Sequence, residues 1–186
     1  MADLYLALLH HSVYDKNGAV VTTAVTNMDV HDLGRLARTY EVRAVYVATP
    51  VPTLRRLVDR IMRHWDTGPG ATYNHTRKEA LALVRLSTDL DAAIADIERE
   101  AGVLPRLIAT TAREGGRRLS STEFRRRLAE PGRPELLILG TGWGLTEDVI
   151  GRADDVLEPI RGVSGWNHLS VRSAAAIILD RARGDR

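Results

Sequence analysis

Runs of apolar residues alternate along the chain with segments in which apolar positions recur every three or four residues. Near-continuous apolar runs are typical of buried parallel strands. Such runs predict strands over residues 4–10, 43–50, 81–87, 106–111, 135–140 and 156–160. Helical spacing of apolar residues predicts amphipathic helices over 30–40, 54–65, 90–101 and 171–182. The alternation predicts a single-domain α/β fold over residues 1–186, with a mostly parallel sheet flanked by helices on both faces.

The composition narrows the class of protein. The chain has 186 residues, of which 44% are hydrophobic, and no cysteine, which excludes disulfides, thiolate catalysis and cysteine-ligated zinc. No apolar run is long enough to cross a bilayer, and the N-terminal residues lack the basic start of a signal peptide. We therefore expect a cytoplasmic protein without a membrane segment or a metal site.

A turn with three alternating glycines follows the run at 135–140. It reads "GTGWG" and precedes a helix-like segment with Glu147 and Asp148 in its first turn. Glycines at such spacing let a ligand approach the backbone closely, although a tight strand-to-helix connection would also use them. The two acids offset the field that binds phosphate at a helix start, and the spacing matches neither common phosphate-binding motif. The turn favours a neutral or cationic nucleoside-like ligand.

Two further glycine-bearing turns also follow predicted strands. The first reads "TTAREGGRR" (110–118), and the second carries Gly162 and Gly165 before a helix rich in small residues. Ligand crevices of open parallel sheets lie beyond the carboxyl ends of the strands. The three turns are therefore expected to share one pocket.

At these turns the sequence resembles a known family. "LILGTGWGL", "LEPIRG" and "HLSVRSAAAIIL" resemble the C-terminal half of the SPOUT superfamily, the trefoil-knotted RNA methyltransferases that use S-adenosyl-L-methionine. The whole chain, including "TTAVTNMDVHDLGRLARTYEVRAVYV", resembles a branch of predicted RNA methyltransferases. This resemblance implies a C-terminal trefoil (α/β) knot over about 106–183, methyl transfer to an unidentified RNA (tRNA or rRNA), and a homodimer that builds its site across two subunits.

The resemblance also implies cofactor-binding residues. Gly140, Gly144 and Leu145 match the superfamily's glycine-glutamate-glycine-leucine turn, but the glutamate is missing and the turn is shorter. Ile160 and Gly162 match the strand end that follows it. The expected contacts of S-adenosyl-L-methionine are Thr110, Leu139, Gly140, Thr141, Gly142, Trp143, Gly144, Ile160, Gly162, Asn167, His168 and Leu169.

Two residues near the N-terminus are the catalytic candidates. Arg35 matches an arginine associated with catalysis in the ribose-methylating branch, and Asp29 stands where that branch has an asparagine. Arg35 is otherwise a helix-surface arginine, and Asp29 a helix cap. His168 either caps the last helix or contacts the ligand. The alternative function is a non-catalytic SAM- or RNA-binding regulatory module that retains the knotted pocket; a nucleotide-binding oxidoreductase is disfavoured by the absent fingerprint.

Arginine is the expected means of RNA binding. Net charge is only +2, but of 26 basic residues only Lys16 and Lys78 are lysines, and arginine suits bidentate phosphate contact. Clustered arginines beside the pocket either line the route of RNA or form a solvated helix face. The polar segment 67–80 is expected to be a substrate-facing loop. The candidate RNA contacts are Arg77, Arg117, Arg118, Arg125, Arg126 and Arg127.

Overall fold

The computed structural model describes residues 1–164 and 166–185, and its centre is a six-stranded sheet. The strand order is β5-β4-β1-β7-β6-β8, and every neighbouring pair is parallel. The strands are β1 (Leu4–Leu9), β4 (Ala44–Ala48), β5 (Val84–Ser87), β6 (Arg106–Ala109), β7 (Glu135–Gly140) and β8 (Asp155–Val156). The expected fold class, a mostly parallel sheet flanked by helices, is confirmed. The trefoil knot stays a prediction.

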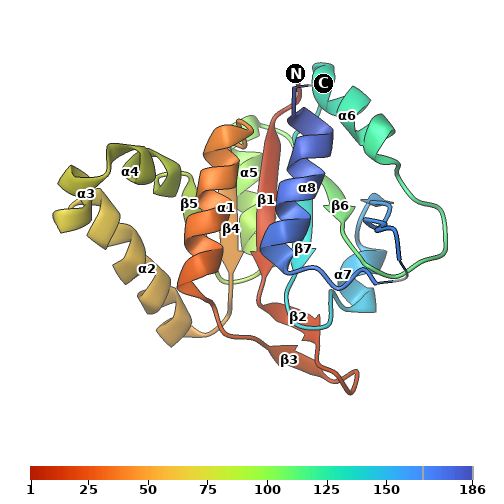
Figure 1. Ribbon diagram of the computed structural model, residues 1–186, viewed down its shortest axis with the longest axis horizontal. Coiled ribbons are helices and arrows are strands. Elements are labelled where there is room, and N and C mark those ends of the chain that lie inside the picture. Colours follow the sequence, from red (N-terminus) through yellow and green to blue (C-terminus); the bar gives the residue numbers. More distant parts are fainter. Residues whose placement is uncertain (165, 186) are drawn as a thin grey trace.

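Alternating side chains of β1 divide the core between the two faces of the sheet. Leu4, Leu6 and Leu8 point into the larger apolar cluster, with side chains of α1 (Asn27–Thr39), α6 (Ser121–Ala129) and α8 (Val171–Arg183). Tyr5 and the other alternate residues point to the opposite face, which α5 (Leu90–Ala101) and α7 (Glu147–Gly151) cover. Figure 1 shows α1 and α8 side by side in front of the sheet, with α5 behind it. Both faces are covered, as the near-continuous apolar strands require.

A helical segment extends beyond β5 at the edge of the sheet. It comprises α2 (Pro52–Asp66), α3 (Pro69–Tyr73) and α4 (His75–Leu81), visible beside α1 in Figure 1. The expectation of a loop over 67–80 is wrong, because Pro69 occupies the first turn of α3 and Asn74 caps α4 by accepting the Arg77 backbone N–H at 3.0 Å. Leu81 belongs to α4, so the strand predicted from 81 begins at Val84.

A hairpin that the pattern did not predict follows β1. It pairs β2 (His11–Tyr14) with β3 (Val20–Thr22) in antiparallel fashion. In Figure 1 this hairpin lies below the carboxyl ends of the central strands, beside α7. Its strands are short, and β3 has no buried residue, so their periodicity carries little signal.

Candidate active site

The three glycine-bearing turns meet at one end of the sheet. They follow β7, β6 and β8, which are neighbours, so their carboxyl ends lie together. The Arg113 guanidinium from the turn after β6 donates to Glu147 at 2.7 Å, at the start of α7. Asn167, in the segment after β8, donates its side-chain N–H to the Ala112 carbonyl at 2.9 Å. An ion pair of 3.0 Å joins Arg161 to Glu114 in the same way. These contacts tie the three turns to one another.

The turn after β7 is held mainly by the β2 strand. Trp143 donates its backbone N–H to the Tyr14 carbonyl at 2.8 Å, and Tyr14 donates its own to the Gly144 carbonyl at 2.9 Å. Thr141 donates its hydroxyl to the Leu9 carbonyl at 3.0 Å. Because the Tyr14 carbonyl lies 2.8 Å from where a side chain of Gly142 would begin, Gly142 is needed for this packing. The structure thus gives one of the three glycines a packing role.

The other two glycines, Gly140 and Gly144, differ in the space around the position that a Cβ would occupy. A Cβ at Gly140 would lie 2.8 Å from the Leu145 backbone nitrogen, so Gly140 permits the chain to turn back on itself. Gly144 has a φ of +100° and no atom within 4 Å of its Cβ position. The side of Gly144 that lacks a side chain is therefore open to a ligand, while its N–H and C=O are bonded to Thr141 and Tyr14. The exposed Asp148 carboxylate in the first turn of α7 suits a ligand with cationic groups. These residues fit S-adenosyl-L-methionine, whose sulfonium and amino groups are cationic.

The remaining predicted cofactor contacts surround these turns. Thr110 donates its hydroxyl to the Ile138 carbonyl at 2.9 Å, Leu139 is buried in β7, and Ile160 is half-buried. Gly162 and Leu169 are exposed in the segment before α8. Gly165 lies outside the described residues. The structure therefore brings the predicted set to one end of the sheet, with Leu139 on the core side.

His168 does not cap the last helix. Ser170 does so, because its hydroxyl accepts the Ser173 backbone N–H at 3.2 Å. His168 instead packs edge-on against Trp166, with ring centres 4.9 Å apart. Its side chain is exposed beside the turns, a position consistent with the second reading of the sequence, contact with the ligand.

Asp29 is part of the framework that holds α1. It forms a capping box with Thr26, whose backbone N–H and hydroxyl both donate to the Asp29 carboxylate, at 3.1 and 2.6 Å. Arg172, at the start of α8, lies 3.8 Å from this carboxylate and 3.4 Å from that of Asp32. Asp29 thus fixes the start of α1 and links it to α8. Its carboxylate already accepts hydrogen bonds, which weakens its case as a general base.

His10, a buried histidine near the glycine turn, was not predicted from the sequence as a site residue. His10 ends the apolar run of β1 and is fully buried; its Nδ1 lies 3.1 Å from the Thr23 hydroxyl. The Thr23 hydroxyl in turn lies 2.5 Å from that of Thr141 in the glycine turn. Burial lowers the pKa of His10, so its imidazole is neutral at pH 7. The signal in the sequence was a histidine directly after a buried strand. In the structure, the side chains of His10, Thr23 and Thr141 form a polar series that reaches the glycine turn.

The predicted RNA-binding arginines separate into different environments. Arg127 is largely buried and pairs with Asp155 at 2.7 Å and Glu135 at 3.2 Å. Arg126 is exposed and pairs with Glu123 and Glu130 on its own helix. Five of the six candidates form a cluster in the sequence: Arg117, Arg118, Arg125, Arg126 and Arg127. One of them is thus held in the fold and another is neutralised by local acids, so the cluster does not form a single free basic rim.

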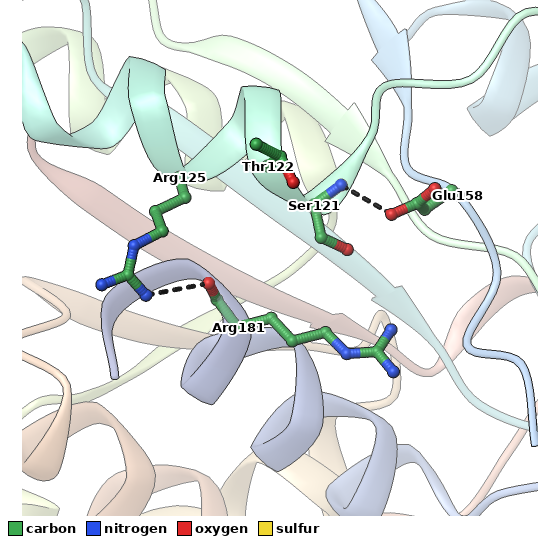
Figure 2. A pocket seen from close by; sticks show the side chains of 5 residues that line it. All are labelled: Ser121, Thr122, Arg125, Glu158 and Arg181. Carbon is green, nitrogen blue, oxygen red and sulfur yellow. Dashed lines mark hydrogen bonds between the residues drawn. The ribbon is translucent and has the colours of Figure 1, made fainter. Parts of the chain in front are cut away.

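Arg125 lines a shallow pocket of about 410 Å³ between α6 and α8. Figure 2 shows its guanidinium donating to the Arg181 carbonyl, while Glu158 accepts the Ser121 backbone N–H at the start of α6. Glu158 also lines this pocket. Arg118 donates to the Arg113 carbonyl at 3.3 Å, whereas Arg117 is exposed. Arg117 is therefore the member of the cluster best placed for an external partner.

Arg35 and Arg77 lie elsewhere, on the α1 and α4 helices. Both line a cleft of about 690 Å³ between α1 and α2. No predicted cofactor residue lines this cleft or the pocket beside α6.

In the described part of the chain, no helix is long and apolar enough to cross a membrane, and no three His, Asp or Glu side chains are grouped to hold a metal ion.

A parallel sheet with glycine turns gathered at its carboxyl end defines an α/β protein with a candidate ligand site at that end. The family model described as SAM-dependent RNA methyltransferase matches residues 3–184, so the chain belongs to this family. The chain is 46% identical, over 98% of its length, to a protein of Oleidesulfovibrio alaskensis named tRNA (guanine-N(1)-)-methyltransferase, of which it covers 42%. It is 41% identical, over 96% of its length, to an uncharacterised protein of Aquifex aeolicus, covering 87% of that protein.

A solved structure with the same fold is the SpoU methyltransferase AviRb of Streptomyces viridochromogenes in complex with AdoMet. The TM-score is 0.56 at 17% identity, and the match covers 97% of this chain and 59% of AviRb. The resemblance to a SPOUT-type fold is thereby confirmed. The present chain spans less than half of the Oleidesulfovibrio relative and most of the Aquifex relative.

Proposed function

We propose that this protein transfers a methyl group from S-adenosyl-L-methionine to a nucleotide of tRNA. The observation that carries the proposal is the joining of three strand-end turns by side-chain contacts, within a chain that matches an RNA methyltransferase family from residue 3 to residue 184. Naming tRNA rests on the Oleidesulfovibrio relative, a protein more than twice as long that is named for this activity. Ribosomal RNA is the other substrate to be tested.

S-adenosyl-L-methionine supplies an electrophilic methyl group on a sulfonium, so the protein need only position the acceptor and remove one proton. The backbone at Gly140 and Gly144 would hold the adenosyl part, with Thr110, Thr141, Ile160 and Leu169 around it. Arg35 remains the proposed catalytic residue, because the exposed guanidinium has no carboxylate partner among the described residues. Asp29 is proposed to position α1 rather than to accept the proton.

The assembly is proposed to be a cytoplasmic homodimer of a single knotted domain, with the knot near residues 106–183. Large apolar side chains are exposed beside the three turns, at Trp143, Val163, Trp166 and Leu169. Such side chains gather at protein interfaces. A partner subunit that covers them would also close the open side of the cofactor site. Sedimentation equilibrium tests this directly; a monomer at micromolar concentration would contradict it.

The function is tested by calorimetry and by methyl transfer. We expect S-adenosyl-L-methionine or its demethylated product to bind with a Kd in the micromolar range, about −8 kcal/mol. Tritiated methyl groups should then appear in total tRNA taken from a deletion strain, and nucleoside mass spectrometry of that RNA should show one missing modification. Arg35→Lys keeps the charge but loses the planar fork, so it should reduce methyl transfer more than RNA affinity.

Three outcomes would change the proposal. Cofactor binding without methyl transfer to tRNA or rRNA would support the non-catalytic regulatory module. No heat with either cofactor form at millimolar concentration would overturn cofactor binding itself. Transfer to rRNA alone would keep the enzyme and change its substrate.

A further inference from the structure

A second concave site lies away from the glycine turns. It is the cleft between α1 and α2, with Arg77 of α4 on its wall, and it has a volume of about 690 Å³. Apolar side chains of Leu57 and Ile61 line one part of it, and Met28 adds a largely exposed side chain. Arg35, Arg60 and Arg77 line the rest, with His31 and His64. The volume and the mixed lining suit a ligand of nucleotide size.

The arginines of this cleft have no acidic partners. Within residues 1–164 and 166–185, no carboxylate lies in ion-pair distance of Arg35, Arg60 or Arg77. Outside the cleft, Arg63 of α2 pairs with Asp59 at 2.9 Å. The acid that lines the cleft pairs with Arg172 on α8.

That acid is Asp32, which lies 3.4 Å from the Arg172 guanidinium. Its charge is therefore offset from outside the cleft, and the three cleft arginines leave an excess of positive charge. Like charges brought together without counter-ions cost free energy in the folded protein, and an anion in the cleft would relieve it. The cleft is thus complementary to a phosphate group.

Trp65 holds one of these arginines in position. The Arg77 guanidinium carbon lies 4.5 Å above the centre of the Trp65 ring. A stack of this kind fixes the guanidinium plane and leaves the N–H groups at its edge free to donate. Gly70 packs against the same indole, since a Cβ there would come within 2.6 Å of the ring. Trp65 is therefore occupied as a support, and its role is to orient Arg77.

His31 lines the cleft without adding charge. Its ring packs edge-on against Trp65, with centres 5.5 Å apart, and its Nδ1 is buried without a hydrogen-bond partner. Burial, followed by the nearby charge of Arg77, lowers the pKa of His31, so the ring is neutral at pH 7. Nδ1 has almost no exposed surface, so His31 lines the cleft as a neutral ring without presenting this nitrogen to a ligand.

We propose that the α1–α2 cleft binds one nucleotide of the RNA substrate, with its phosphate on Arg60 and Arg77 and its base against Leu57 and Ile61. The inference rests on the proposed function and deepens it, because it assigns the RNA contact to the helices beyond β5. Arg35 lies on the α1 wall of the same cleft, so a nucleotide bound there is held beside the proposed catalytic arginine.

The matched pair Arg60→Gln and Arg56→Gln tests this site. Both arginines are exposed on α2 and neither forms an ion pair among the described residues, but only Arg60 lines the cleft. Binding of deproteinised total tRNA is measured by fluorescence anisotropy over a series of KCl concentrations. Arg60→Gln should weaken binding about tenfold and lower the salt slope by about 0.7 to 0.9, the value for one lost phosphate contact. Arg56→Gln should match the wild type.

Further outcomes separate this inference from the proposed function. Calorimetric affinity for S-adenosyl-L-methionine and the Tm should be unchanged in Arg60→Gln, which excludes a folding defect. Equal RNA affinity and equal salt slope in the two variants would overturn the cleft as an RNA site while leaving methyl transfer in place. Wild-type protein that binds no RNA would overturn it as well. RNA binding that depends on Arg60, without methyl transfer, would contradict the proposed enzyme activity and support the cleft as an RNA site.

Discussion

Replacement of Arg127 by leucine separates a role in the fold from a role in RNA binding. The guanidinium pairs with Asp155 at 2.7 Å and with Glu135 at 3.2 Å, and the Glu135 side chain is only 3% exposed. Breaking a buried pair costs about 3 to 5 kcal/mol because the remaining charge is left uncompensated. Arg106 also lies 3.4 Å from Glu135 and keeps part of the compensation. We therefore expect a loss of about 2 to 3 kcal/mol at pH 7.

The pH dependence of this loss has a definite sign. Burial raises the pKa of Glu135, so the contribution of this carboxyl to stability is full below about pH 4.5 and is lost as the pH rises through its folded-state pKa. Leucine at 127 removes a cation that lowers that pKa. The cost of the substitution should therefore shrink as the pH falls from 7 towards 4.5.

Urea denaturation of Arg127→Leu and Arg126→Leu at both pH values measures the effect. Arg126 is exposed and pairs only with Glu123 and Glu130, which are close to it in the sequence, so its loss should cost much less stability than the loss of Arg127. For a chain of this length, the expected loss at Arg127 corresponds to roughly 4 to 12 °C in Tm. Equal stability of the two variants at pH 7, with no difference in their pH dependence, would refute the reasoning.

Three further predictions follow from single contacts. Gly142→Val should lower both the Tm and the affinity for S-adenosyl-L-methionine, because the new side chain meets the Tyr14 carbonyl at 2.8 Å; thermal melting and calorimetry check this, and unchanged melting would contradict it. Arg172→Gln should cost about 1 kcal/mol in urea denaturation by removing the ion pairs between α8 and α1, and high salt should reduce that cost. Burial lowers the pKa of His10, so its contribution to stability is full above about pH 6.5 and is lost as the pH falls through its folded-state pKa; a His10→Gln variant should lose less stability between pH 7 and pH 5, and an identical slope would exclude this histidine as a cause.

The sequence by itself determined the class of fold and the end of the sheet at which the glycine turns gather. Period and run length are local properties, and they give buried parallel strands and amphipathic helices without knowledge of their partners. The glycine turns after residues 109, 140 and 156 follow strands, so their gathering at one end is a consequence of a parallel sheet. The identity of the expected cofactor came from the resemblance of these turns to the SPOUT superfamily.

Side-chain roles were decided by the tertiary structure. Arg125, Arg126 and Arg127 are adjacent and identical in type, yet one donates to a carbonyl of α8, one pairs within its helix, and one is buried against β7 and β8. Which partner each meets depends on residues as far as 56 positions away in the sequence. A local pattern in the sequence carries no information about a contact between residues so far apart.

The α1–α2 cleft was likewise decided by the tertiary structure. The polar character of residues 67–80 predicted a loop, but Pro69 and Asn74 instead start two helices, α3 and α4. The packing of these helices on α2 places Arg77 over Trp65. Whether an arginine is neutralised or left free depends on which acids the fold brings near it. That is a property of the packed helices, because charge pairing acts through space over a few ångströms, whereas the sequence records only order along the chain.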